Sequence, residues 1–353
     1  MIRFPKIRST IILIIIFSFI FSESSESNVA FDIAFSYYKE AKWDSAQFYF
    51  NEVINNNNLD ISPELTIAAY RNIGNSLIRL HKLDEAIHPL EQSIFYAKEY
   101  FGESNQYLVK AMNSLAVISS IKGESKNAIS YFEQIIQVQM NVDSTKYILL
   151  GKLYNNIANS YSDLNEFDTA IRNYKSALFY KEKEFGKGAS KLAVTYNNIG
   201  TIYHNMGNHD EAIDYFKFAL KYKDDSYAPS SLAKIYKNMA LSLTKMNDLE
   251  LAKSYILKAI ELENIREAYT HFITLGNIYK SLNDYDQAIG SYNHSLFIID
   301  SLKIDDQKHY GNVMNHLGLI YLAQMDTTTA KDYFDKSINI HKTQRQVSYL
   351  IHY

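Results

Sequence analysis

The side chains with chemical potential in this sequence are ten histidines and a large set of carboxylates, and cysteine is absent. A chain without cysteine has no disulfide, no thiolate ligand for zinc and no cysteine nucleophile. No two histidines stand four apart with an intervening glutamate, the spacing that presents two zinc ligands and a base on one helix face. His204 and His209 flank a predicted turn, and we interpret them as surface side chains. The sequence therefore predicts no metal site.

Paired carboxylates would suit acid–base catalysis, but Asp224–Asp225 and Asp305–Asp306 fall between periodic segments. There we interpret them as solvated turns. Neither a glycine-rich loop after a strand nor a nucleophile elbow of the GxSxG type is present. The net charge of -3, from 36 basic and 39 acidic residues, provides no global field that would attract nucleic acid. We predict a protein that is not an enzyme, needs no cofactor and does not bind nucleic acid.

The elements that position the remaining side chains form a repeat. One alanine recurs through the chain with gaps of 40, 42, 42, 42, 40, 36 and 42 residues, and positions in each repeat are counted from it below. Position -12 is always glycine or alanine, and position +4 is always bulky. The repeat alanines are Ala46, Ala86, Ala128, Ala170, Ala212, Ala252, Ala288 and Ala330. Eight repeats are therefore predicted.

Each repeat has helical spacing on both sides of a break. Tyr196, Ile199, Gly200 and Tyr203 follow the i, i+3, i+4, i+7 pattern, and a second helix follows that contains the repeat alanine. Position -5 is suited to a left-handed C-cap in five repeats, and acidic residues often follow as N-caps, as in Asp248, Asp284 and Asp326. The five predicted C-cap residues are Gly123, Asn165, Gly207, Asn247 and Asn283. Each repeat is predicted to be a helix hairpin, and the fold class is all-α.

This pattern resembles the tetratricopeptide repeat (TPR), whose first helix has the order aromatic, two residues, Leu, Gly, two residues, Tyr. The resemblance covers residues 28–342, and the gaps of 42 are similar to those of kinesin-light-chain-like repeats. It implies a right-handed α-solenoid superhelix of about eight antiparallel helix hairpins. Ser119 departs from the pattern in the tyrosine slot of the third repeat, and Ala30 departs in the aromatic slot of the first. The linkers 99–102 and 184–186 resemble the N-terminal repeat region of bacterial CHAT-domain proteins, which carry a caspase-like protease.

The two ends of the chain differ from the repeats. Residues 1–24 combine a basic start, the apolar run 11–21 and a small polar exit, the pattern of a secretory signal peptide. We expect an exported protein, periplasmic or secreted. Alternatively, the segment is an uncleaved anchor, and only then do we expect the chain to contact a membrane. At the other end, residues 343–353 are predicted to be the start of a truncated further helix or a C-terminal cap.

The resemblance implies that five positions of each first helix, -18, -15, -11, -8 and -7, face a concave groove. Across eight repeats these positions contain nine cations and a single acid, Asp163, in a chain whose overall charge is negative. Asparagine is also frequent there, and its amide can both donate to and accept from a peptide main chain. The candidate peptide-binding residues are Arg71, Asn75, Asn113, Lys152, Asn155, Asn159, Asn197, Asn205, Lys234, Lys237, Lys245, Asn277, Lys280 and Asn315.

Two functions remain open. The first is a non-enzymatic scaffold or adaptor that binds an extended, acidic segment of a protein in this groove. The alternative is an N-terminal recruitment or sensor module of a longer CHAT-protease or sensor-kinase protein, here truncated. Polar residues also occur on any solvated helix face. The excess of cations over acids is therefore a stronger argument for a binding groove than the number of asparagines.

Overall fold

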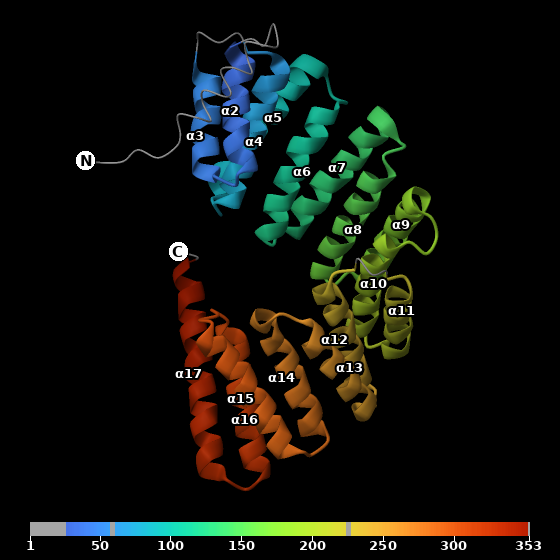
Figure 1. Cartoon of the computed structure of the whole chain (residues 1–353), viewed down its shortest axis with the longest axis vertical. Helices are drawn as coiled ribbons and strands as arrows, with labels where there is room; N and C mark the ends of the chain where they lie inside the picture. Colours follow the sequence, from blue (N-terminus) through green and yellow to red (C-terminus); the bar gives the residue numbers. More distant parts are fainter. Residues whose placement is uncertain (1–25, 57–60, 224–226, 352–353) are drawn as a thin grey trace, which may run out of the picture. The chain divides into compact units, whose positions relative to one another are not determined.

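The computed structural model describes residues 26–56, 61–223 and 227–351, with residues 26 and 344–351 as backbone only. These residues form sixteen α-helices and one short 3₁₀ turn, and no strand occurs among them. The chain divides into two compact units, residues 1–180 and 181–353, each built from helix hairpins in chain order (Figure 1). The predicted signal segment, residues 1–24, lies outside the described residues.

The first unit contains four hairpins in which consecutive helices pair. Within the hairpins α2 packs on α3, α4 on α5 and α6 on α7, and a hydrogen bond from Tyr174 to Asn159 joins α9 to α8. The helices are α2 (Glu26–Lys39), α3 (Trp43–Asn55), α4 (Pro63–Arg79), α5 (Leu83–Phe101), α6 (Gln106–Ile121), α7 (Ser125–Asp143), α8 (Tyr147–Asp163) and α9 (Phe167–Phe185), whose last turn passes the unit boundary.

The second unit repeats this plan with four further hairpins. Each first helix packs against the second helix that follows it, and successive hairpins stack on one another. Its elements are the 3₁₀ turn Ser190–Leu192, α10 (Ala193–Asn205), α11 (His209–Lys221), α12 (Pro229–Lys245), α13 (Leu249–Leu262), α14 (Ile265–Ser281), α15 (Tyr285–Ser301), α16 (Gln307–Ala323) and α17 (Thr327–Ile351). All eight predicted repeats are thus hairpins, and the predicted all-α solenoid fold is confirmed.

The small residue at position -12 sets the distance between the two helices of a hairpin. In the fifth hairpin, a Cβ atom added to Gly200 would lie 2.6 Å from Cε1 of Phe216 at position +4. Both residues are buried, and the Phe216 ring covers the glycine backbone. The close approach predicted from the pairing of a small with a bulky residue is therefore confirmed.

The hairpin turns share one backbone conformation. All five residues predicted as C-caps have positive φ, between 60° at Asn165 and 83° at Gly207. Ala41, His81 and Met325 occupy the same position in the other three hairpins and have positive φ as well, although their residue types gave no sign of it. In each turn the next N–H donates to a carbonyl five residues earlier, for example Asn208 N to Tyr203 O at 2.9 Å, which closes a Schellman motif.

The three predicted N-cap residues differ in their side-chain bonds. Asp284 accepts from the N–H of Gln287 at 3.3 Å and Asp326 from the N–H of Thr329 at 3.0 Å. Asp248 is the N-cap residue of α13, as predicted, but its side chain makes no capping hydrogen bond. The turn before α13 is therefore stabilised by its backbone bonds, not by a side-chain cap.

The first helices form the inner face of each unit. In the first unit α2 contacts α4 and α4 contacts α6; in the second, α10, α12, α14 and α16 contact one another in series. No two second helices among the described residues contact each other as extensively. A stack whose first helices lie closer together curves toward them, so their exposed positions face the hollow side.

Of the two predictions for the end of the chain, the start of a further helix is not what the backbone shows, and a C-terminal cap stays a prediction. The backbone is helical without interruption from Thr327 to Ile351, so residues 343–351 continue α17 and do not begin another helix. No break of the kind found at position -5 separates them from the rest of α17. None of the helices in the described part of the chain is both long and apolar enough to cross a membrane.

Candidate functional site

The inner face of the first unit contains a cavity of about 980 Å³ between α4, α6, α8 and the end of α7. Four of the predicted groove residues, from three different first helices, line this cavity together. They are Arg71, Asn75, Asn113 and Lys152. The sequence register therefore placed these side chains in one site, although they are as many as 81 residues apart.

The cavity is positively charged. Its lining includes the cations Arg71, Lys110, Lys146 and Lys152 and a single acid, Asp143, which pairs with Lys146 at 3.4 Å. Arg71 forms no ion pair with a carboxylate among the described residues, and burial lowers the pKa of its guanidinium. A guanidinium remains charged under all ordinary conditions, so the cavity presents a partly desolvated cation to a ligand.

The amides of the cavity are partly engaged by the protein itself. The Ser114 hydroxyl donates to Oδ1 of Asn75 at 2.7 Å, and this bond joins α6 to α4. Further amides of the lining come from Gln106, Asn113, Gln139 and Asn156. With one lone pair of its oxygen engaged, Asn75 keeps its two N–H groups and the second lone pair for a ligand.

Sequence reasoning missed the contribution of α7. Gln139, Val142 and Asp143 from the end of this second helix line the cavity, together with Lys146 just before α8. The prediction considered only positions on first helices. The 19-residue length of α7 could have indicated that its last turn reaches the inner face.

Two predicted residues of the first unit lie elsewhere. Neither Asn155 nor Asn159 lines the cavity. The Tyr174 hydroxyl donates to Oδ1 of Asn159, across from α9. Tyr174 is buried, so the oxygen of Asn159 serves as an acceptor for a hydroxyl of the hairpin core.

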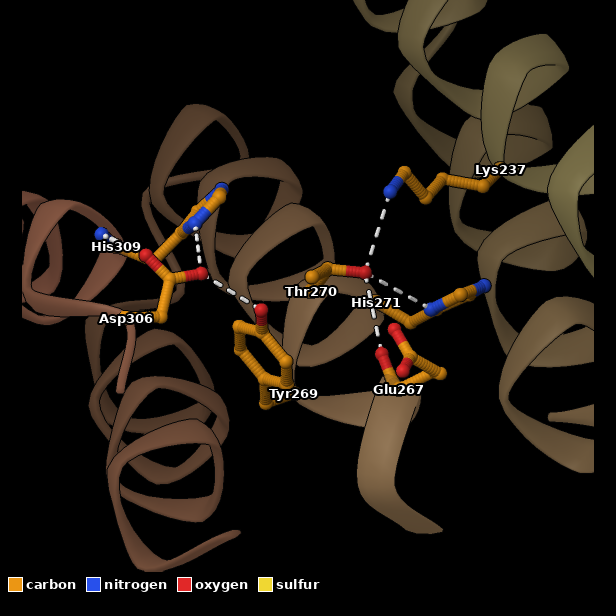
Figure 2. A network of polar contacts seen from close by, with 7 residues as sticks. All are labelled: Lys237, Glu267, Tyr269, Thr270, His271, Asp306 and His309. Carbon is orange, nitrogen blue, oxygen red and sulfur yellow. Dashed lines mark hydrogen bonds and ion pairs between the residues drawn. The ribbon is translucent and has the colours of Figure 1, made fainter. Parts of the chain in front are cut away.

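In the second unit, predicted residues form hydrogen bonds between successive first helices. Lys237 Nζ on α12 donates to Oγ1 of Thr270 on α14 at 3.2 Å, and Lys280 Nζ on α14 lies 3.2 Å from Nδ1 of His316 on α16. Figure 2 shows Lys237 and Thr270 pointing toward one another from their two helices. These positions face the neighbouring first helix as well as the hollow side. The other predicted residues here that are exposed are Asn205, Lys234, Lys245 and Asn315.

Asn197 is a correction to the predicted groove. Its side chain is only 5% exposed, and its Oδ1 accepts from Nδ2 of Asn238 at 3.1 Å. It therefore joins α10 to α12 and is not available to a ligand. Asn277 also has an internal partner, because the buried Tyr292 hydroxyl donates to its Oδ1 at 2.6 Å.

Burial lowers the pKa values of the basic groups at these contacts. Burial, and then the charge of Lys237, lowers the pKa of His271 to about 4; burial, and then Lys280, lowers that of His316 to about 4. Burial lowers the pKa of both lysines too. Neither lysine forms an ion pair with a carboxylate among the described residues, although the charges of Glu263 and Glu267 act on Lys237 and oppose the lowering of its pKa.

A second polar cluster in Figure 2 is structural in character. Asp306 caps α16 by accepting from the N–H of His309 at 3.0 Å, and it accepts from the Tyr269 hydroxyl at 2.7 Å. The ring of His309 lies 2.6 Å from the same carboxylate. Although burial opposes it, the bonds from Tyr269 and His309 keep the pKa of Asp306 below its usual value. In the described part of the chain, no cluster of three or more metal-ligating side chains occurs.

Comparisons with known proteins agree with this architecture. Family profiles described as tetratricopeptide repeat match residues 151–183, 191–263 and 272–296, which correspond to the fourth to seventh hairpins. The chain contains tetratricopeptide repeats. The linkers 99–102 and 184–186 lie outside the matched ranges, so their resemblance to CHAT-domain proteins stays a prediction.

Solved structures share the TPR fold at low sequence identity. A structure titled APC/C hetero-tetramer Cut9-Hcn1 is 16% identical, with a TM-score of 0.54, over 93% of this chain and 55% of that one. BtubC (BKLC) from P. vanneervenii is 18% identical, with a TM-score of 0.51, over 70% of this chain and 94% of that one. No curated protein matches the chain. At these identities the likeness concerns the fold.

Proposed function

We propose that this TPR protein is a non-enzymatic scaffold or adaptor that binds an extended, acidic segment of a partner protein on its inner faces. TPR proteins in general are protein–protein interaction scaffolds without catalysis. The observation that supports an acidic ligand is the lining of the first unit's cavity, where four cations face one acid. Carboxylates are the protein groups that such a surface attracts most strongly.

The state of the asparagine amides supports the same ligand chemistry. Three of the predicted asparagines, Asn75, Asn159 and Asn277, accept a hydroxyl through their side-chain oxygens. The N–H groups of these amides make no bond in these three contacts and complement the carbonyls and carboxylates of an acidic peptide.

Charge reversal on the inner face tests the proposal. The variant Arg71→Glu/Lys110→Glu/Lys152→Glu changes three side chains of the cavity. A matched control, Lys126→Glu/Arg172→Glu/Lys175→Glu, makes the same change in net charge at exposed positions of second helices. Binding of fluorescent peptides rich in Glu and Asp is measured by anisotropy, with otherwise identical peptides rich in Lys for comparison.

We expect the unmodified chain to prefer acidic peptides, the cavity variant to lose this preference and the control to retain it. Binding should weaken with added salt, because the attraction is between exposed charges. Equal loss in both variants would mean that net charge alone drives binding, and the groove proposal would be abandoned. The variant Lys234→Glu/Lys237→Glu/Lys245→Glu asks the same question of the second unit.

We further propose that the protein acts after export, as the composition of residues 1–24 indicates. N-terminal sequencing of the chain from its native source tests this. A mature start near residue 25 supports export with cleavage, and an intact basic start together with membrane association supports an anchor instead.

A further inference from the structure

Stacked tyrosine pairs recur between the two helices of several hairpins. One pair joins position -16 of the first helix to position +10 of the second. It occurs in the second, fourth and fifth hairpins, with ring centroids 5.4–5.5 Å apart. The pairs are Tyr70 with Tyr96, Tyr154 with Tyr180, and Tyr196 with Tyr222.

A second pair joins positions -9 and +3 in three hairpins. Its ring centroids are 4.9–5.4 Å apart, again within the range of favourable aromatic contacts. The pairs are Tyr37 with Tyr49, Tyr203 with Tyr215, and Tyr321 with Tyr333. The fifth hairpin has both pairs, and the first, second, fourth and eighth hairpins have one pair each.

The third hairpin lacks both pairs, as the sixth and seventh do. Its positions -16 and +10 are Met112 and Val138, and position -9 is Ser119, so Tyr131 at +3 has no ring stacked on it among the described residues. A cavity of about 500 Å³ opens at this place, and Met112, Val138 and Tyr131 all line it. Positions -16 and +10, which line the cavity here, hold a stacked tyrosine pair in the neighbouring second and fourth hairpins.

The lining of this cavity suits a ring with a polar edge. Its floor is the buried apolar face of α6, formed by Leu108, Met112 and Leu115. The amides of Gln134 and Gln137 lie among the polar groups of the lining, where they can bond a hydroxyl or a main chain. Apolar floors with a few polar groups are typical of sites for small aromatic groups.

We propose that the cavity between α5 and α7 binds a tyrosyl side chain of a partner protein, whose ring takes the place of the missing stacked tyrosines. The ring would lie on Met112 and Val138 and stack on Tyr131. This site is formed by second helices and by the α6 face beneath them, so it is separate from the acidic-peptide groove. It does not depend on the proposed function of the inner face.

The probe for this proposal is p-cresol, which is the side chain of tyrosine as a free molecule. The full chain is labelled with ¹³C at its eight methionine methyl groups. The Met112 signal is assigned with Met112→Leu. We expect p-cresol to shift the Met112 methyl signal upfield in a saturable way, because a bound ring lies directly over it. The saturated analogue 4-methylcyclohexanol should not displace bound p-cresol.

Filling the cavity gives the decisive comparison. Val138→Tyr restores the ring at position +10, so it should itself shift the Met112 signal, abolish the p-cresol effect and raise the melting temperature. Met140→Tyr adds the same side chain at an exposed position of α7 outside the cavity and should leave p-cresol binding unchanged. Met112→Phe serves as a second filling variant, read by loss of the p-cresol shift at the Tyr131 ring protons. Saturable binding that survives both filling variants, or no p-cresol shift of Met112 in the unmodified chain, would overturn the proposal.

Discussion

The close helix contact at Gly200 makes a quantitative prediction. A Cβ added there would lie 2.6 Å from Cε1 of Phe216 and 3.1 Å from the carbonyl oxygen of Ala212, which is backbone and cannot move aside cheaply. Overpacking of this kind costs about 1–3 kcal/mol, whereas Gly→Ala in an unobstructed helix gains about 1 kcal/mol. Gly200→Ala should therefore destabilise the protein by up to about 2 kcal/mol, and Gly200→Leu by more than about 3 kcal/mol.

The matched control is Gly290→Ala. Gly290 lies inside α15 and an added Cβ would meet no atom within 4 Å, so the same substitution should stabilise by about 1 kcal/mol. Urea unfolding followed by circular dichroism gives the midpoints, and hydrogen exchange in α10 and α11 shows whether the change is local, since repeat arrays need not unfold in one step. If Gly200→Ala is as stable as Gly290→Ala, the hairpin register is wrong.

A double variant identifies the atom pair responsible. The sixth hairpin has Ala240 and Ile256 at positions -12 and +4, where the fifth has Gly200 and Phe216. Gly200→Ala/Phe216→Ile copies this natural pair into the fifth hairpin. Because the ring that obstructs the new methyl is gone, the two substitutions together should cost less than the sum of each alone, by about 0.5–3 kcal/mol. Strict additivity would show that the strain comes from the Ala212 carbonyl and not from the ring.

The remaining predictions concern a turn and a buried histidine. His81 has φ of 59° in the turn before α5, where a side chain is strained, so His81→Gly should stabilise by about 1 kcal/mol in thermal unfolding, and a loss would refute the turn assignment. The pKa of His271 is lowered to about 4 by burial and Lys237, so the unfolded chain binds more protons between pH 4 and about 6.5. Stability should rise with pH through this window and level off above it, by an amount on the order of 1–3 kcal/mol from His271. In urea midpoints His271→Gln should remove this part of the rise and leave the part that comes from His316, whose pKa is also lowered to about 4.

The hairpin turns illustrate how far the sequence predicts the fold. Glycine and asparagine at position -5 identified five left-handed turns from residue type alone. The turns at Ala41 and Met325 were found from the register of the repeat alanines and not from type, because neither residue favours positive φ. The backbone bonds of the Schellman motif hold these residues at positive φ. Such bonds do not require a particular residue type, so the residue types do not reveal them.

The candidate site was predicted less completely, for a reason visible at Asn197. Arg71 and Lys152 occupy positions whose side chains reach the cavity, as the repeat register predicts. Asn197 occupies an equivalent position, yet Asn238 of the next hairpin covers it. Its burial thus depends on a residue 41 positions away in the sequence. A helical periodicity describes one helix, whereas exposure in a stack depends on the side chain that the next repeat presents.

The contacts between successive first helices also decide how much charge the inner face keeps. Lys237 and Lys280 bridge successive first helices through Thr270 and His316, yet neither bridge neutralises the positive charge, because a hydroxyl and a neutral imidazole accept a hydrogen bond without carrying a negative charge. Had these partners been carboxylates, the helices would be joined equally well and the face would be electrically neutral. A stack that joins its first helices through neutral partners therefore keeps the positive charge of its inner face.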